Sequence, residues 1–185
     1  MAQPGHQVGG IAGDMFVAAL TDAVPELRRR VLDDVAAVLP PAAGTAHFME
    51  GTSAGLTVLR FGLEGHRHDA GHHHHDGSGS YRHMVELIRA APLAEGTADH
   101  AAAILTVLAE AEAFIHGVPL GDVHFHEIGD WDSLMDVVAS GSIIAALDAT
   151  WSASDLPLGG GRVRTAHGLL PVPAPATGGG PGPGT

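Results

Sequence analysis

Apolar residues recur at helical spacing in several stretches of the chain, and the breaks between them are marked by proline and glycine. Pro25 is placed to begin a helix and Pro40 to follow its end, while Gly117 is suited to the C-cap of the longest apolar stripe. This pattern predicts helices over residues 15–20, 25–39, 81–89, 97–116 and 133–148.

Two stretches rich in residues that favour strands, 45–50 and 56–63, are separated by Gly51 and Gly55, which predicts a hairpin or two neighbouring strands. A further short strand is expected over residues 122–128. Helices and strands in this order predict an α+β fold, a single layered domain with helices packed on a small mixed sheet. The domain is expected to span residues 8–177.

Two segments are unsuited to a core. Residues 65–80 are rich in histidine, glycine, aspartate and serine, and predict a flexible loop. Residues 178–185 are almost entirely glycine and proline, and predict a disordered tail.

Composition narrows the chemistry. The chain has no cysteine, which excludes disulfides, zinc fingers and thiolate catalysis. Its net charge of −12 disfavours nucleic-acid binding, and no apolar run approaches the ~18–20 residues that span a bilayer. The N-terminus has no signal-peptide pattern, so a cytoplasmic location is expected. The 14 histidines in an acidic chain indicate a metal bound by imidazole and oxygen.

The first candidate site is the segment His124-Phe125-His126-Glu127. On a strand, His124 and His126 would share a face with their Cα atoms about 6.6 Å apart, so both rings could reach one ion. Glu127 could act as a ligand, as a partner of a ligand or as a base. Asp132 could complete the site or cap the helix that follows. The alternative is a strand end with two exposed histidines.

The second candidate is the histidine-rich loop, which could capture Ni²⁺, Zn²⁺ or Cu²⁺ but is too flexible for catalysis. The alternative is a solvated polar linker. Its densest run of metal-ligand candidates consists of His72, His73, His74 and His75.

Two further groups could contact an anion. Backbone N–H groups at Gly10 and Gly13 could hold a phosphate at a helix start. Asp14 could bind that phosphate through a metal, or could simply cap the helix. Arg162 and Arg164 would share a strand face and could bind an anionic ligand.

Taken together, four motifs resemble the N-terminal region of LarC-type nickel insertion proteins, which act in the biosynthesis of the nickel-pincer nucleotide. The resemblance covers nearly all of residues 8–177. The motifs are GGIAGDMF (9–16), the histidine loop ending in Tyr81, AEAFIHG through VHFHEIG (111–129) with Asp132-Ser133, and LPLGGG with HGLLPVPAPAT (156–177).

The resemblance implies delivery of Ni²⁺ to pyridinium-3,5-bisthiocarboxylic acid mononucleotide, whose product serves a lactate racemase-type apoenzyme. It also implies a CTP-dependent reaction, with Mn²⁺ or Mg²⁺ as candidate accompanying ions. In the family, CTP is associated with a C-terminal domain that this sequence lacks, so a separate C-terminal-half protein is an expected partner. A homo-oligomer is a further candidate assembly.

Two functions therefore stay open. In the first, the chain is the nickel-binding half of a cyclometallase, a lyase in which Glu127 or Asp14 removes a ring proton. In the second, it is a non-catalytic nickel or zinc carrier or store. A zinc hydrolase is a third possible function, but this sequence lacks an evident third histidine at helical spacing for such a site. Ligand chemistry alone would favour copper over nickel, so nickel enters only through the resemblance.

Overall fold

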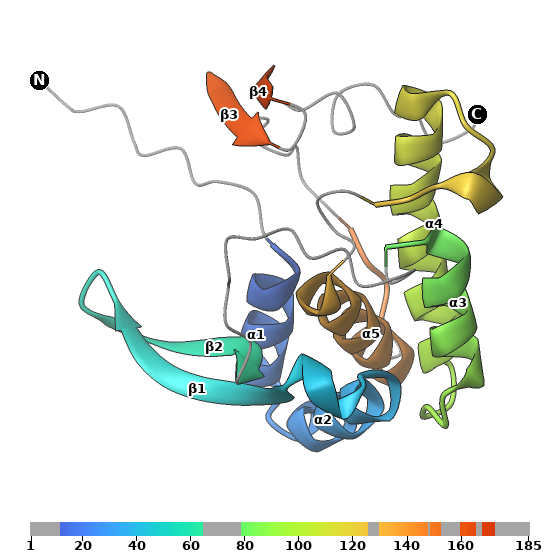
Figure 1. The fold of residues 1–185 in the computed structure, drawn as a ribbon. Coiled ribbons are helices and arrows are strands. Elements are labelled where there is room, and N and C mark those ends of the chain that lie inside the picture. Colours follow the sequence, from blue (N-terminus) through green and yellow to red (C-terminus); the bar gives the residue numbers. More distant parts are fainter. Residues whose placement is uncertain are drawn as a thin grey trace, which may run out of the picture.

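The computed structural model describes residues 12–64, 79–125, 130–147, 149–152, 160–165 and 168–172. In these residues, α-helices surround a buried core and a curved hairpin lies along one side (Figure 1). The predicted α+β class is confirmed. The helices are α1 (Gly13–Ala23), α2 (Leu27–Val38), α3 (Tyr81–Ala90), α4 (Thr97–His116) and α5 (Trp131–Ala146), with 3-10 turns at Pro41–Ala43 and Leu120–Asp122.

Helix α5 is the centre of the core, packed against α1, α2 and α4. Nine of its 16 residues are buried, as expected of a helix covered by its neighbours. A Cβ atom at Gly141 would lie 2.6 Å from the backbone nitrogen of Ala101, so only glycine allows α4 and α5 to approach this closely. The buried residues of α5 include Leu134, Met135, Val138, Ala139 and Ile143.

Strands β1 (Thr45–Ser53) and β2 (Leu56–Glu64) form an antiparallel hairpin that packs on α1. The two-residue turn between them contains Gly55 at φ +81°. Strands β3 (Arg162–Thr165) and β4 (Gly168–Pro171) form a second antiparallel pair. The expected mixed sheet is thus wrong for the described strands, which form two separate hairpins. Short connections permit only antiparallel pairing, because parallel strands need a long crossover.

In residues 122–125, the part of it that the structure describes, the expected strand over residues 122–128 is also largely absent. Residues 120–122 form a 3-10 turn, and only one bridge follows, between His124 and Ser80. Because α3 begins directly after Ser80, the ladder has no further partner residues on that side. The segment still alternates, with Val123 and Phe125 buried and His124 exposed.

A buried carboxylate on α2 connects this helix to α4 and α5. Asp34 of α2 is 3% exposed. It accepts hydrogen bonds from the Ala94 backbone N–H at 2.7 Å, the Thr97 hydroxyl at 2.8 Å and the Ser142 hydroxyl at 2.6 Å. These bonds satisfy a charge that would otherwise be costly to bury.

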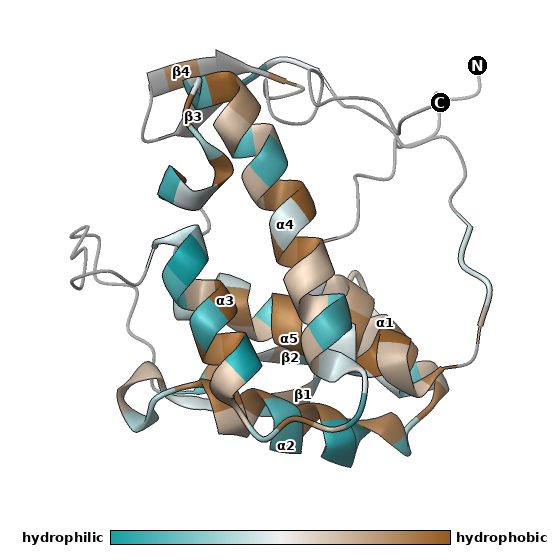
Figure 2. Ribbon diagram, turned by 90° about the vertical axis from the view of Figure 1, so that its right-hand side faces the viewer, coloured by the Kyte–Doolittle hydropathy of each residue, from teal (hydrophilic) through white to brown (hydrophobic). Residues whose placement is uncertain are grey.

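The apolar stripe predicted on α4 is buried only in the first half of the helix. Leu105 is fully buried, whereas Leu108 is 38% exposed. The C-terminal half extends beyond α5, and brown segments continue along it in Figure 2. Val107 and Phe114 are 66% and 65% exposed there. In the described part of the chain, no helix has the length and apolar character needed to cross a bilayer.

Candidate functional site

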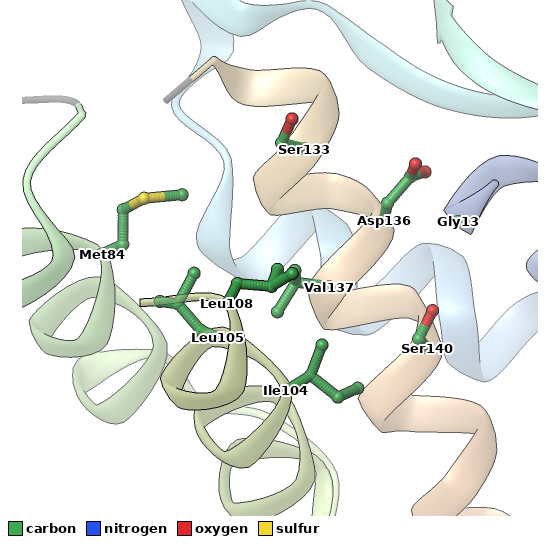
Figure 3. A pocket seen from close by; sticks show the side chains of 9 residues that line it. All are labelled: Gly13, Met84, Ile104, Leu105, Leu108, Ser133, Asp136, Val137 and Ser140. Atoms are coloured by element: carbon green, nitrogen blue, oxygen red, sulfur yellow. The ribbon is translucent and has the colours of Figure 1, made fainter. Parts of the chain in front are cut away.

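The beginning of α1 lies against the first half of α5, which brings the end of the glycine turn to an acidic side chain. Gly13 is the first residue of α1 and Asp136 lies in the second turn of α5. A Cβ atom at Gly13 would lie 2.6 Å from Oδ2 of Asp136, so a side chain at this position would displace the carboxylate. Figure 3 shows Asp136 directed toward Gly13.

Asp136 has an unusual electrostatic environment for a carboxylate. Its Oδ1 is buried and has no hydrogen-bond partner among the described residues. Burial, followed by the negative charge of Asp14, raises the pKa of Asp136 to about 7. A hydrogen bond from the Asp14 backbone N–H opposes this pKa shift, while Asp132 and Asp130 add to it. The carboxyl group therefore exchanges its proton near neutral pH, which suits a general acid or base.

A cavity of about 220 Å³ opens beside Asp136 between α3, α4 and α5. One side is polar and comes from α5, with Ser133, Asp136 and Ser140 in one row. The other walls are apolar. This volume lies below the ~300 Å³ at which pockets for drug-sized ligands begin, so it suits a single ring. The remaining lining residues are Gly13, Met84, Ile104, Leu105, Leu108 and Val137.

A smaller cavity of about 150 Å³ is lined by two histidines, His116 and His124. Its polar lining consists of Glu112, His116, Asp122 and His124. The Nε2 atom of His116 lies 3.2 Å from Oε2 of Glu112, one helical turn away on α4. His124, predicted as a metal ligand, therefore lines the same cavity as a second histidine and a glutamate.

The two cavities are linked by a row of side chains on α4. Ile104 and Leu108 line the larger cavity, while Glu112 and His116 line the smaller one. Residues four apart on a helix are neighbours on its surface. With a rise of about 1.5 Å per residue, Leu108 and Glu112 are separated by about 6 Å along the helix axis.

A third opening, of about 590 Å³, lies between α1 and the β1–β2 hairpin. Asp14 and Arg60 both line it. Among the described residues, Arg60 has a hydrogen bond to the Thr52 carbonyl at 3.4 Å and no carboxylate partner. Asp14 thus borders this groove, while its backbone N–H reaches Asp136 on the other side.

The structure places some predicted residues differently from the sequence analysis. Asp132 was a candidate cap of α5, but the cap is Asp130, which accepts a hydrogen bond from the Ser133 backbone N–H at 2.9 Å. Asp132 instead lies in the first turn. Asp14 was a candidate cap of α1, but Ala12 is in that position, and Asp14 lies in the first turn.

Other predicted residues are only partly described. Arg162 is exposed on β3, and the side chain of Arg164 lies outside the described residues. Within the described ranges, no three histidine, aspartate or glutamate side chains form a group ready to hold one metal ion. The predicted residues that lie wholly outside the described part are Gly10, His72, His73, His74, His75, His126 and Glu127.

Sequence reasoning did not identify Asp136. A signal was present, because Asp136 lies within a predicted helix, four residues after Asp132, which precedes that helix. Val137 and Val138 follow directly, so the acid belongs to a mostly apolar helix. An acid in such a place needs a partner or a function.

Comparison with known proteins gives a consistent result. A family model described as nickel insertion protein matches residues 6–178. A protein of Geobacter sulfurreducens that carries the name of a nickel insertion protein is 42% identical over 167 residues, which cover 89% of this chain and 41% of the relative. A Geobacillus kaustophilus relative is 37% identical over 169 residues, covering 89% of this chain and 40% of the relative. Its name is pyridinium-3,5-bisthiocarboxylic acid mononucleotide nickel insertion protein.

The chain therefore spans about 40% of the length of the curated relatives that it matches. No solved structure matches it.

Proposed function

Because this chain belongs to the nickel insertion protein family, we propose that it binds Ni²⁺ and presents it to pyridinium-3,5-bisthiocarboxylic acid mononucleotide. The product would be the nickel-pincer nucleotide. Since the chain spans about 40% of its relatives, the complete reaction is proposed to need the remaining part of the family's length as well. CTP, with Mn²⁺ or Mg²⁺, would act through that remaining part.

The observation that supports this proposal is that two cavities with different polar side chains both border α4. Imidazole and carboxylate groups line the smaller cavity at one end, and Asp136 lines the ring-sized cavity at the other. Formation of a carbon–nickel bond at a ring C–H position needs both a site for the ion and a group that can accept the proton. The first group lies on and beside α4, and the second, Asp136, lies on α5, which packs against α4.

Nickel is the substrate of this reaction, and its proposed ligands are histidines. His124 is exposed at the smaller cavity, beside His116 and Glu112, and His126 follows two residues later in the sequence. Imidazole and oxygen donors suit Ni²⁺. Asp132 stays a proposed additional ligand. His72, His73, His74 and His75 are proposed to capture nickel and raise its concentration near the site.

For the nucleotide part of the substrate, we propose the same contacts that the sequence analysis predicted. Gly10 and Gly13 are proposed to offer backbone N–H groups to the phosphate, and Arg162 with Arg164 to neutralise it. The groove between α1 and the hairpin adds Arg60 as a further cation near α1, one that lacks a carboxylate partner among the described residues.

Calorimetric titration with Ni²⁺ tests the metal site. We expect a chain lacking residues 66–76 to keep one tight site, which the double change His124→Ala with His126→Ala removes. His100→Ala is the matched control, because His100 is an exposed histidine near the opposite end of α4 from His116. A double variant that binds Ni²⁺ as tightly as its parent would contradict the proposed ligands.

The same titration decides between insertion and storage. The absence of a three-donor group among the described residues favours a carrier that relies on its histidine loop. If deletion of residues 66–76 removes all Ni²⁺ binding, the storage function is supported and the insertion function is not.

A further inference from the structure

We propose that the cavity between α3, α4 and α5 receives the pyridinium ring of the mononucleotide, and that Asp136 accepts the ring proton as the carbon–nickel bond forms. This inference rests on the proposed function and adds to it the ring-binding cavity and the residue that acts as the base. It replaces Asp14 and Glu127, the acids considered from the sequence, in the role of base.

The shape and lining of the cavity fit a flat heteroaromatic ring. Its volume of about 220 Å³ is too small for a whole nucleotide and large enough for a ring with short substituents. Met84 and Leu108 offer apolar surface from α3 and α4 to the ring faces. Ser133 and Ser140 offer hydroxyls from α5 to polar substituents at the ring edge.

The carboxylate of Asp136 is held in place while one of its oxygens is engaged by no hydrogen-bond donor among the described residues. The Asp14 backbone N–H donates a hydrogen bond to it, and the missing side chain of Gly13 leaves room for Oδ2. Oδ1 has no hydrogen-bond partner among the described residues. A base needs such an oxygen, because a lone pair already engaged by a donor cannot take a second proton as readily.

The charges around Asp136 keep its basicity high. Asp14 on α1 and Asp130 and Asp132 on α5 are all negative, whereas α3 and α4 contribute apolar side chains to the cavity. No cationic side chain in the described ranges pairs with the carboxylate, and the whole sequence lacks lysine. These surroundings hold the pKa of Asp136 at about 7, so the group is poised to gain and lose a proton at neutral pH.

The proposed step balances without an oxidant or a reductant. The ring C–H bond breaks, and its electron pair forms the carbon–nickel bond. The proton goes to Asp136 and then to solvent, and nickel stays divalent throughout. Asp14, in contrast, lines the groove between α1 and the hairpin.

The position of the metal relative to this base is set by α4. Leu108 lines the ring cavity, and Glu112 follows one turn later in the cavity that contains His124. A rise of about 6 Å between these positions is comparable to the span of a substituted pyridine ring. A ring seated in the larger cavity would therefore direct one edge toward the histidines.

The test is a reconstituted reaction of the full protein, including the part of its relatives' length that this chain does not span, with Ni²⁺, CTP and the thiocarboxylated mononucleotide, followed by mass spectrometry of the product. We expect Asp136→Asn to lower kcat by about 10²–10⁴-fold while calorimetric Ni²⁺ affinity is unchanged. We expect the wild-type rate to rise with pH up to about 7 and the residual rate of the variant to lose this dependence. Asp136→Glu should restore part of the rate.

Matched variants separate the chemistry from general damage. Asp33→Asn alters an exposed acid on α2 and should leave the rate unchanged. Leu108→Trp should fill the cavity and raise KM, whereas Val107→Trp, on the exposed side of the same helix, should not.

The two proposals fail differently. If the wild-type chain yields no product, the proposed function fails and the role of Asp136 fails with it. If the wild-type chain yields product and Asp136→Asn retains the full rate with the same pH profile, only the role of Asp136 is overturned.

Discussion

Replacing Asp136 with asparagine should stabilise the folded chain, and the gain should depend on pH. The carboxylate is buried beside the charge of Asp14, and folding therefore raises its pKa from 3.8 to about 7. A raised carboxyl pKa means that the folded state disfavours the charged form. Asparagine has the same shape, carries no charge and keeps an oxygen that can accept the Asp14 N–H.

The magnitude follows from proton linkage. One pKa unit corresponds to about 1.4 kcal/mol, so the rise from 3.8 to about 7 sets a ceiling of about 4 kcal/mol for the cost of charging Asp136. Asp136 is only partly buried, and solvent screening reduces this ceiling to about 1–2 kcal/mol above pH 7. Below about pH 4 both states are protonated and the cost vanishes. Stability is therefore lost as pH rises from about 4 to 7.

Urea unfolding of the metal-free chain at pH 5 and pH 8 measures this effect. We expect the free energy of unfolding of Asp136→Asn to exceed that of the wild type by about 1–2 kcal/mol at pH 8 and by clearly less at pH 5. The m-values of the two proteins should be similar. Asp33→Asn is the control, because Asp33 is 73% exposed and lies in an i,i+4 pair with Arg29. An equal gain at both pH values, or a loss at pH 8, would refute the assigned environment of Asp136.

Three further predictions concern positions that hold the site and core together. Gly141→Ala should destabilise the chain by about 2–3 kcal/mol in urea unfolding, because its Cβ would lie 2.6 Å from the Ala101 backbone nitrogen. Asp34→Ala should cost about 3 kcal/mol in the same assay, since it leaves three buried donors from two helices and a loop without their acceptor; an unchanged midpoint would contradict the network. Gly13→Ala should displace the Asp136 carboxylate and lower product formation at least tenfold, while Gly62→Ala, which has open space around its Cβ, should not.

Local patterns predicted the helices and the first hairpin well. The apolar spacing in α3 and α4, and Gly117 at φ +64° after α4, are properties of neighbouring residues that sequence shows directly. The hairpin followed from the glycine between two strand-like runs. The cap of α5 was assigned to Asp132 rather than Asp130 because both acids precede the apolar run, and only the backbone conformation distinguishes them.

The candidate site was less accessible to sequence reasoning, because it depends on contacts between distant segments. Gly13 and Asp136 meet across two helices that are far apart in the chain, and no local pattern encodes this contact. His116 is the last residue of α4, where a histidine complements the helix dipole, yet it also lines the cavity of His124. The sequence motifs therefore indicated the candidate segments. The packing of α1 on α5 was needed to single out Asp136 as the proposed base.

The row of side chains on α4 makes the proposed site sensitive to helical register. One residue inserted between Leu108 and Glu112 would rotate everything beyond it by about 100°, carrying His116 away from the face that Leu108 occupies. Four inserted residues would nearly restore that face but add about 6 Å of separation. Natural length changes in this stretch should accordingly be rare, and those that occur should come in whole turns.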